Sequence, residues 1–512
     1  MNSSREPKIS TLPSGWAWTQ IDDVLEPQED GQTLHQGWSP RCEKVPSQSE
    51  EDWGVLKTTA IQPGLFLPEH NKLLPEELRP RPRIEVRAGD ILITCAGPRA
   101  RCGVACLVKR TRRRLMMSGK MYRFRVPSQN MESRFVEYFL QTMAARDAID
   151  KMKTGGSDSG LNLTHDRFRL LGIPLAPTPE QRRIVAKIEE LFSQLDAGVE
   201  ELKKAKAQLK RYRQSVLKAA FEGRLTSEWR LANSDKIEPV AKLLERIRAE
   251  RKKARGTKYK EPPPLDTMGL PELPEGWAWA RLDELADSML GKMLDKARHT
   301  TGTRLPYLRN VNVRWCTVDT DDLSTMFFRD GESDRYGLAK DDVLVCEGGE
   351  PGRAAVWHDE IPDMRFQKAL HRVRLAAGMP PMWLVLQLQR DAAQGHLEDY
   401  FTGSTIKHFT GEGLSRYAVR IAPLAEQRLV VEEVERRLSI ADAEEKAIEA
   451  ALKQAARLRQ SILKRAFEGR LVPQDPMDEP ADRLLERIRA EKAKQAAGQP
   501  RGRGRRTAAA GK

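Results

Sequence analysis

The chain carries most of its recognisable motifs twice, in the same order. Leu-Pro-Ser-Gly-Trp-Ala-Trp at Leu12 to Trp18 returns as Leu-Pro-Glu-Gly-Trp-Ala-Trp at Leu273 to Trp279. A Phe-Glu-Gly-Arg-Leu run closes at Leu225 and again at Leu471. The repeated segment is far longer than the unit of a solenoid, so the sequence predicts two similar modules of mixed α+β structure.

Composition limits the kind of protein this can be. With 512 residues, 39% of them hydrophobic, the chain is too long for one core and predicts two to four domains. It has no apolar run of bilayer length, and its first residues lack the apolar core of a signal peptide, so we expect a cytoplasmic protein without membrane contact. Cys95, Cys102 and Cys106 lie close together without a neighbouring histidine, which favours ordinary thiols over a zinc site.

Each copy continues with an apolar run that reads as a buried strand, at Asp90 to Ile93 and at Asp342 to Val345. A loop rich in glycine and arginine follows each run, and neither loop fits a nucleotide-binding motif. The alternation in Gly-Trp-Ala-Trp puts both tryptophans on one face, where buried packing is favoured over a stacking platform for bases. Residues 26–88 and 288–340 share little sequence and are expected to be divergent inserts.

A long helix is specified from Thr178, where Thr-Pro-Glu-Gln forms a capping box, to Gly223, which suits a left-handed cap. About 44 residues would make a helix of about 66 Å. Apolar residues recur every seven positions in both copies. This seam comprises Ile188, Leu195, Leu202, Leu209 and Val216 in copy one and Val434, Ala441, Ile448, Ala455 and Ile462 in copy two. We expect the two helices to pair as an antiparallel coiled coil, the alternative being that each packs on its own domain or on another chain.

Charged, amphipathic helices are predicted near the end of each copy, at Leu243 to Glu250 and Leu484 to Glu491. The sequence leaves open whether they are solvated caps or partner-binding elements. A proline-rich linker separates the copies, and an Arg/Gly tail near the C-terminus is predicted to be disordered.

The charge balance favours a polyanionic partner, since 87 Lys and Arg against 73 Asp and Glu give a net charge of +14. Charge alone would also suit an inert basic surface. However, basic and hydrogen-bonding residues gather in matched loops of both copies, and such side chains can neutralise phosphates and address base edges. The predicted DNA-binding residues are Arg99, Arg101, Lys109, Arg110, Arg112, Arg113, Lys120, Arg123, Lys153, Ser157 and Asn162 in copy one, and Arg353, Gln367, Lys368, His371, Ser404, Thr405, Lys407 and His408 in copy two.

Catalysis by the chain itself is not expected. The sequence lacks the zinc-protease, nucleophile-elbow, Walker and calcium-loop motifs, and also the aromatic tetrapeptide of amino-methyltransferases. No metal site is predicted, and no catalytic residue is assigned. Two other hypotheses remain open at this point: a stand-alone duplicated DNA-binding regulator, and an enzyme with unrecognised carboxylates.

Over nearly its full length the chain resembles the specificity subunit of type I restriction–modification systems (the HsdS family). The resemblance rests on the paired Leu-Pro-x-Gly-Trp motifs, the Gly-Asp-Ile-Leu and Asp-Val-Leu-Val strands, Gly403-Ser404-Thr405, and the closing Phe-Glu-Gly-Arg-Leu runs. Ile173 to Pro177 with Glu180-Gln181, and Ile421 to Leu424 with Glu426-Gln427, follow the same pattern. Copy one departs from it with Gly156-Ser157-Asp158, and copy two lacks the threonine cap.

The resemblance implies a fold with two target recognition domains, each reading half of a split site in double-stranded DNA. Two long helices, forming an antiparallel coiled coil with pseudo-twofold symmetry, would hold the domains apart. It also implies two modification subunits that methylate adenine with S-adenosylmethionine, and restriction subunits that translocate with ATP and Mg, so this chain itself needs no cofactor. The implied domains are recognition domain 1 (1–177), a central helical region (178–255), a linker (256–272), recognition domain 2 (273–423), a C-terminal helical region (424–495) and a basic tail (496–512).

Overall fold

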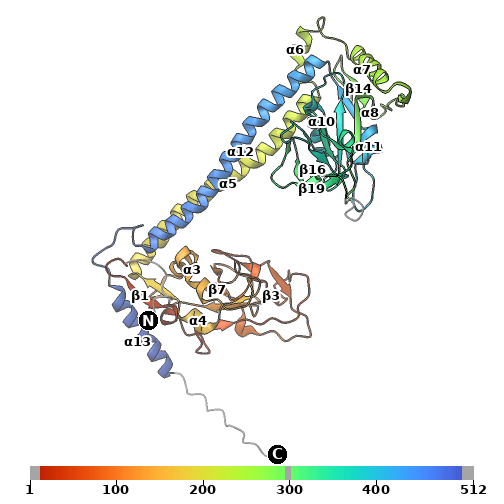
Figure 1. Ribbon diagram of the computed structural model, residues 1–512. Helices are drawn as coiled ribbons and strands as arrows, with labels where there is room; N and C mark the ends of the chain where they lie inside the picture. Colours follow the sequence, from red (N-terminus) through yellow and green to blue (C-terminus); the bar gives the residue numbers. More distant parts are fainter. Residues whose placement is uncertain (1–11, 295–300, 499–512) are drawn as a thin grey trace, which may run out of the picture. The chain divides into compact units, whose positions relative to one another are not determined.

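The computed structural model describes residues 12–294 and 301–498 (Figure 1). The chain divides into two compact units: unit 1 combines Met1–Leu202 with Ala450–Lys512, and unit 2 is Lys203–Glu449. Both divisions fall inside the longest described helices, α5 (Thr178–Phe221) and α12 (Leu424–Phe467), each of 44 residues. Each unit therefore holds the start of one long helix and the end of the other. The predicted basic tail lies, from residue 499 on, outside the described residues.

The long helices end where the sequence predicts. Gly223 has φ +65°, and the amide of Arg224 donates to the carbonyl of Ala219 over 2.9 Å. Gly469 repeats this with φ +65°, and Arg470 donates to Arg465 over 2.8 Å. A left-handed glycine lets the chain turn back and satisfy carbonyls at the helix end.

Unit 1 is built on a four-stranded antiparallel sheet in the order β2-β11-β7-β9 (Leu34–Gln36, Met121–Phe124, Ile91–Thr94, Ala105–Leu107). A second sheet has the order β10-β3-β6 (Leu115–Met116, Gly54–Leu56, Asn71–Leu73), and the strand pairs are β1-β13 (Ala17–Gln20, Gly172–Leu175), β4-β5 (Ile61–Gln62, Leu65–Phe66) and β8-β12 (Ala96–Gly97, Leu161–Asn162). The helical elements are α1 (Ile21–Val24), η1 (Thr58–Ala60), η2 (Pro82–Ile84), α2 (Ser133–Gln141), α3 (Met143–Met152), α4 (His165–Arg169) and α13 (Ala481–Gly498).

Unit 2 repeats this topology. Its four-stranded sheet has the order β15-β23-β20-β21 (Ala286–Leu290, Leu370–Leu375, Val343–Cys346, Ala354–Val356), beside β19-β16-β22 (Ser324–Phe328, Thr303–Leu308, Arg365–Phe366), β14-β24 (Ala278–Arg281, Ala418–Ile421) and β17-β18 (Val313–Arg314, Thr317–Val318). Its helical elements are α6 (Ser227–Ala232), α7 (Val240–Arg255), η3 (Gly256–Lys258), α8 (Leu282–Leu285), η4 (Asn310–Asn312), α9 (Glu332–Tyr336), α10 (Pro381–Ala393), η5 (Glu398–Tyr400) and α11 (Gly411–Arg416). The repeated sequence is thus a repeated strand order.

The predicted central strands are buried, as expected from their continuous apolar runs. All four residues of β7 and of β20 are buried, with alternate side chains entering different cores. The acidic residue before each strand is buried too, and it pairs with an arginine at or just after the end of the neighbouring strand. Asp90 accepts from Nε of Arg125 over 2.6 Å, and Asp342 accepts from Nε of Arg374 over 2.6 Å. A buried carboxylate needs such a partner, so the duplicated Asp is structural.

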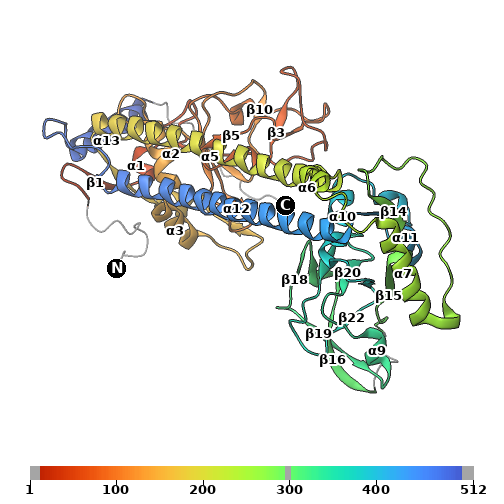
Figure 2. The same cartoon turned by 90° about the horizontal axis from the view of Figure 1, so that it is seen from above.

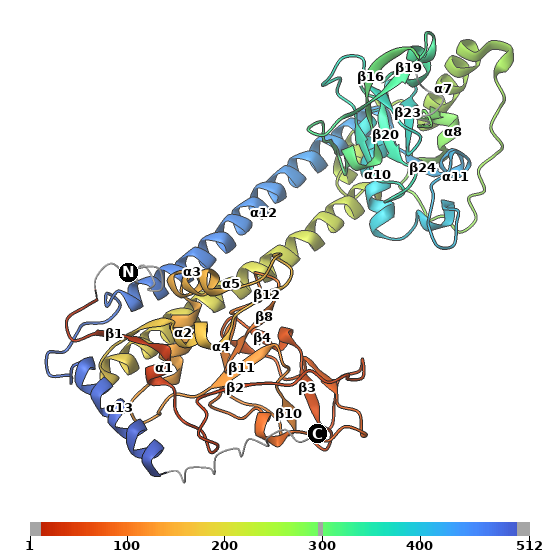
Figure 3. The same ribbon diagram turned by 60° about the horizontal axis from the view of Figure 1, so that its bottom comes forward.

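Each unit is completed by the closing segment of the other copy. Helix α13, from copy two, packs on the unit 1 core through Leu484 and Ile488 (Figure 3). Helix α7, from copy one, packs on the unit 2 core through Leu243 and Ile247. Arg489 of α13 pairs with Asp23 in unit 1 over 2.9 Å. The amphipathic closing helices are therefore integral parts of the cores. The sequence alone had left their role open.

Within each unit, α5 and α12 lie side by side (Figure 2). In unit 1, Arg459 lies 4.0 Å from the ring centre of Phe192, and its guanidinium also pairs with Asp196. In unit 2, Arg213 pairs with Asp442 over 2.7 Å, and Lys206 pairs with Glu449 over 2.7 Å. Of the seam residues, Ile188, Val216, Val434, Ala441, Ala455 and Ile462 are buried, whereas Leu195, Leu202, Leu209 and Ile448 are partly exposed.

Across the described ranges, no helix has both the length and the apolar character that a membrane span requires.

Candidate nucleic-acid interface

Four segments of unit 1, distant in sequence, are linked to one another by hydrogen bonds. They are η1 with β4 (residues 58–62), the glycine loop 96–103, the turn 118–120 and the loop 153–162. The glycine loop is central, because β8 pairs with β12 in the loop 153–162. Just before it, the amide of Cys95 donates to the carbonyl of Lys120 over 2.9 Å. We call these four segments face 1.

Arg101 joins the glycine loop to the η1 segment. Its guanidinium donates to the carbonyl of Ile61 over 2.7 Å, to the carbonyl of Thr58, and to the Gln62 side chain over 3.2 Å. Because its guanidinium already donates these hydrogen bonds, Arg101 fixes the backbone of the η1 segment and has few N–H donors left for a phosphate. Arg101 therefore acts as a clamp that shapes face 1.

Unit 2 has the same four segments: 310–314, 348–353, 367–369 and 402–408, which we call face 2. Its clamp is Arg353, whose guanidinium donates to the carbonyl of Asn310 over 2.8 Å. The Asn310 amide donates in turn to the carbonyl of Gly348 over 3.1 Å, and Glu347 N donates to the carbonyl of Ala369 over 2.9 Å. Arg101 and Arg353 thus hold equivalent turns against equivalent glycine loops.

A buried side chain on the central strand tethers the last segment of each face. Tyr122 on β11 donates to the carbonyl of Leu163 over 2.7 Å, and Nε2–H of His371 on β23 donates to that of Phe409 over 2.8 Å. Burial lowers the pKa of His371, which favours the neutral imidazole. His371 is 1% exposed, so it offers no group to a ligand at the surface.

Arg123 is likewise internal. It is 6% exposed, and its guanidinium donates to the carbonyl of Arg83 over 3.1 Å and to the Gln28 side chain over 2.8 Å. Arg372 has the same place in unit 2 and donates to the carbonyl of Gly337 over 2.6 Å. Arg123 and His371, both predicted from the sequence to bind DNA, are therefore not part of the exposed surface of either face.

The other residues predicted for copy one occupy two places. Face 1 includes the exposed Arg99, Lys120, Ser157 and Asn162 and the partly buried Lys153. Arg99 pairs there with Asp158 over 2.9 Å, and Lys153 donates to the carbonyl of Arg99 over 2.9 Å. A separate cluster of Lys109, Arg110, Arg112 and Arg113 precedes β10, which Figure 3 shows away from β8 and β12.

The residues predicted for copy two, apart from His371, all lie on face 2. Ser404, Thr405, Lys407 and His408 are exposed, while Gln367, Lys368 and Arg353 are partly buried. The sequence reading missed Val311 and Ile406, which are exposed aliphatic residues on the same face. It also missed the turn segments 58–62 and 310–314, which a common offset of 252 residues relates, the same offset as Asp90 and Asp342.

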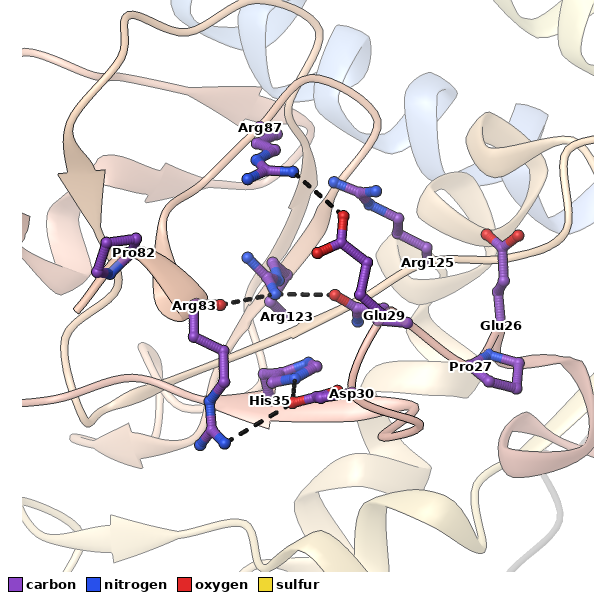
Figure 4. Close-up of a pocket in the computed structure, with 11 residues that line it drawn as sticks. Glu26, Pro27, Glu29, Asp30, His35, Pro82, Arg83, Arg87, Arg123 and Arg125 are labelled. Carbon is purple, nitrogen blue, oxygen red and sulfur yellow. Dashed lines mark hydrogen bonds and ion pairs between the residues drawn. The ribbon is translucent and has the colours of Figure 1, made fainter. Parts of the chain in front are cut away.

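Unit 1 also contains a charged pocket of about 280 Å³ that shares no residue with face 1 (Figure 4). In its wall His35 donates to Asp30 over 2.9 Å, and Arg83 approaches the same carboxylate at 3.7 Å. Arg87 pairs with Glu29 at 3.9 Å. Acidic residues from the loop before β2 thus meet arginines in and after η2, so these pairs hold the two parts of the insert together.

Neither thiol chemistry nor metal binding has a built site among the described residues. No group of three or more His, Cys, Asp or Glu there is placed to hold a metal ion. Burial raises the pKa of the Cys95 thiol to about 12, which keeps it protonated and inert at neutral pH.

Comparison with known proteins points to one class. No protein-family model matches the chain. It is 24% identical over 501 residues to the EcoKI type I restriction enzyme specificity subunit of Escherichia coli K12, covering 94% of this chain and 96% of the relative. A shorter match to the Escherichia coli EcoEI specificity subunit, 38% identical over 193 residues, covers 38% of this chain and about a third (32%) of that protein.

A solved structure has a similar fold. A chain from a structure describing complex assembly and conformational transition of the type I R-M system aligns with a TM-score of 0.61, covering 90% of this chain and 99% of that one at 19% identity. The likeness is one of fold, and in this chain that fold consists of two duplicated units, each holding parts of both long helices. In sequence, the chain is thus similar to specificity subunits of type I restriction enzymes, over nearly its full length at 24% identity and over a shorter segment at 38% identity.

Proposed function

We propose that this chain is the DNA-sequence specificity subunit of a type I restriction–modification complex. Faces 1 and 2 would each read one half of a bipartite site, and the chain would carry out no chemistry itself. The observation that carries the proposal is the equivalence of the faces: the same four segments, held by Arg101 and Arg353, recur on the same strand order. We place the recognition domains at 1–177 and 273–423, as the sequence predicted.

The spacing between half-sites is assigned to α5 and α12 as an antiparallel coiled coil. The ion pairs support this arrangement, because the partner's number falls along α12 as the residue number rises along α5: Asp196 with Arg459, Lys206 with Glu449, and Arg213 with Asp442. The buried seam residues at both ends of the helices support it as well.

Catalysis is assigned to partners. Two modification subunits would supply S-adenosylmethionine-dependent adenine methylation, and restriction subunits would supply ATP- and Mg-dependent translocation and cleavage. We keep the prediction of a cytoplasmic location for such a complex. The relatives described above give no support to the alternative of a stand-alone regulator.

The test is to change the helix length. One heptad inserted after Leu202 and one after Glu449 add about 10 Å, equivalent to about three base pairs. Methylome sequencing of cells that express the variant with its modification subunits should show a longer unread gap between unchanged half-sites. Three heptads in each helix add about 31 Å, close to one turn of DNA, so both faces should again meet the same side of the duplex. We therefore expect this variant to methylate better than the one-heptad variant.

The matched control inserts the same seven residues once in the linker, after Pro264, where no helix is extended. Its gap should equal that of the wild type. An unchanged gap in both helix variants would contradict the spacer role. If the wild-type complex shows no site-specific methylation at all, the proposed function itself is contradicted.

A further inference from the structure

The last segment of each face, 153–162 in unit 1 and 402–408 in unit 2, is anchored in the same way but exposes different side chains at its tip. In unit 1, Thr154 and Asn162 exchange backbone hydrogen bonds of 2.8 and 2.7 Å, and in unit 2 Thr402 and His408 exchange bonds of 2.9 Å. Between these anchors, unit 1 exposes residues 156–160, Gly-Ser-Asp-Ser-Gly. Unit 2 exposes Ser404, Thr405, Ile406 and Lys407.

The unit 2 loop is tightly folded around Gly403. This glycine has φ +91°, and a Cβ there would lie 2.2 Å from the carbonyl oxygen of Ile406. Only glycine therefore permits the close approach, which fixes the backbone at Ile406. The Ile406 side chain remains 67% exposed, and its β-branch restricts its rotamers. The aliphatic group is thus presented in a defined position before any ligand binds.

Face 2 also exposes Val311, 48% accessible, next to Asn310, which bonds the Gly348 carbonyl. Aliphatic side chains contribute nothing to phosphate binding, for which the same face carries Lys407 and Lys368. The apolar group that a duplex offers at its major-groove edge is the C5 methyl of thymine. An aliphatic tip flanked by cations and hydroxyls matches a base edge that carries that methyl.

We infer that Ile406 is a specificity-determining residue of unit 2 that reads a thymine methyl in its half-site. Unit 1 has no such residue at the equivalent tip within 156–160, so its half-site should lack this contact at that loop. The inference rests on the proposed function and names part of the target of face 2. It involves contact only, with no bond made or broken.

The experiment uses the complex of this chain with its modification subunits and a duplex carrying the target defined by methylome sequencing. Each thymine in both half-sites is replaced singly by deoxyuridine, which removes only the methyl group. For the wild type we expect one thymine, in a single half-site, at which the replacement weakens binding about fivefold. The Ile406→Ala complex should bind the thymine and uracil duplexes equally at that position, while Ile406→Val should retain part of the difference.

Met268→Ala is the matched control, because Met268 is an exposed aliphatic residue (89%) in the linker of the same unit. It should reproduce the wild-type thymine profile. The inference is overturned if no thymine-to-deoxyuridine replacement weakens binding, or if the half-site read by unit 2 contains no thymine. It is also overturned if Ile406→Ala weakens binding to the thymine and uracil duplexes by the same factor. Those results would still show site-specific binding, whereas absence of any site-specific binding would overturn the proposed function itself.

Discussion

The indole nitrogen of Trp277 donates a hydrogen bond of 3.0 Å to the carboxylate of Glu426. The equivalent bond in unit 1, from Trp16 to Glu180, is also 3.0 Å. The first motif of each copy is thereby fastened to the first turn of its own long helix. The environments differ, because Glu426 also accepts from Thr226 and Arg230, both over 2.7 Å, whereas burial raises the pKa of Glu180.

This difference predicts unequal costs of removing the two carboxylates. Glu426→Ala leaves the Arg230 guanidinium, Trp277 and Thr226 without their shared partner, so we expect a loss of roughly 3–5 kcal/mol in unfolding free energy. Glu180→Ala mainly orphans the Trp16 indole and should cost about 1–3 kcal/mol. Urea unfolding of both variants measures this, and an equal loss would mean that the Arg230 contact contributes nothing.

Glu137 predicts a pH dependence of stability. It is 1% exposed on α2, and burial raises its pKa to about 7, opposed by a hydrogen bond from the Leu107 amide. The folded state thus keeps the proton that the unfolded state releases near pH 4.5, so stability falls by roughly 3 kcal/mol as the pH rises from about 4.5 to 7. Glu137→Gln should remove this slope and be more stable than the wild type above pH 7. A slope that persists in the variant would assign it to other groups.

The seam of the long helices predicts a graded response. Ile188 is fully buried in the unit 1 core, so Ile188→Ala should cost about 2–5 kcal/mol. Leu209 occupies the same heptad position but is partly exposed, and Leu209→Ala should cost clearly less, about 1–2 kcal/mol. Thermal unfolding of the two variants gives the order, and the reverse order would contradict the burial described above.

Salt dependence separates clamps from phosphate contacts. Lys407→Ala should weaken DNA binding by the complex and reduce the slope of log K against log salt by about one, because one fewer counterion is released. Arg353→Ala should weaken binding without changing the slope, since its guanidinium bonds the Asn310 carbonyl instead of DNA. The measurement is a binding titration at several salt concentrations, and an altered slope for Arg353→Ala would make it a direct contact.

Features that depend only on residues close in sequence could be predicted from the sequence. The left-handed glycine at Gly223 acts only on neighbouring residues, so the end of α5 followed from the sequence. Its start at Thr178 was also predicted, but the Thr178 hydroxyl donates to the distant Asn130 carbonyl instead of closing a capping box. The buried strands β7 and β20 followed from the sequence as well, because their apolar runs are continuous. The repeated motifs also predicted two similar modules, which agrees with the equivalent strand orders of the two units.

Only the tertiary structure decided which basic residues reach solvent and which copy completes which core. Arg101, Arg123 and His371 look alike in sequence to the exposed Arg99 and Lys407, yet their partners are carbonyls and amides brought in from elsewhere in the chain. Likewise, the sequence of α7 and α13 left open whether they are solvated or bind a partner, and in the structure each buries its apolar face on the core of the other copy. Burial is set by neighbours in space, and a sequence pattern reports neighbours only along the chain.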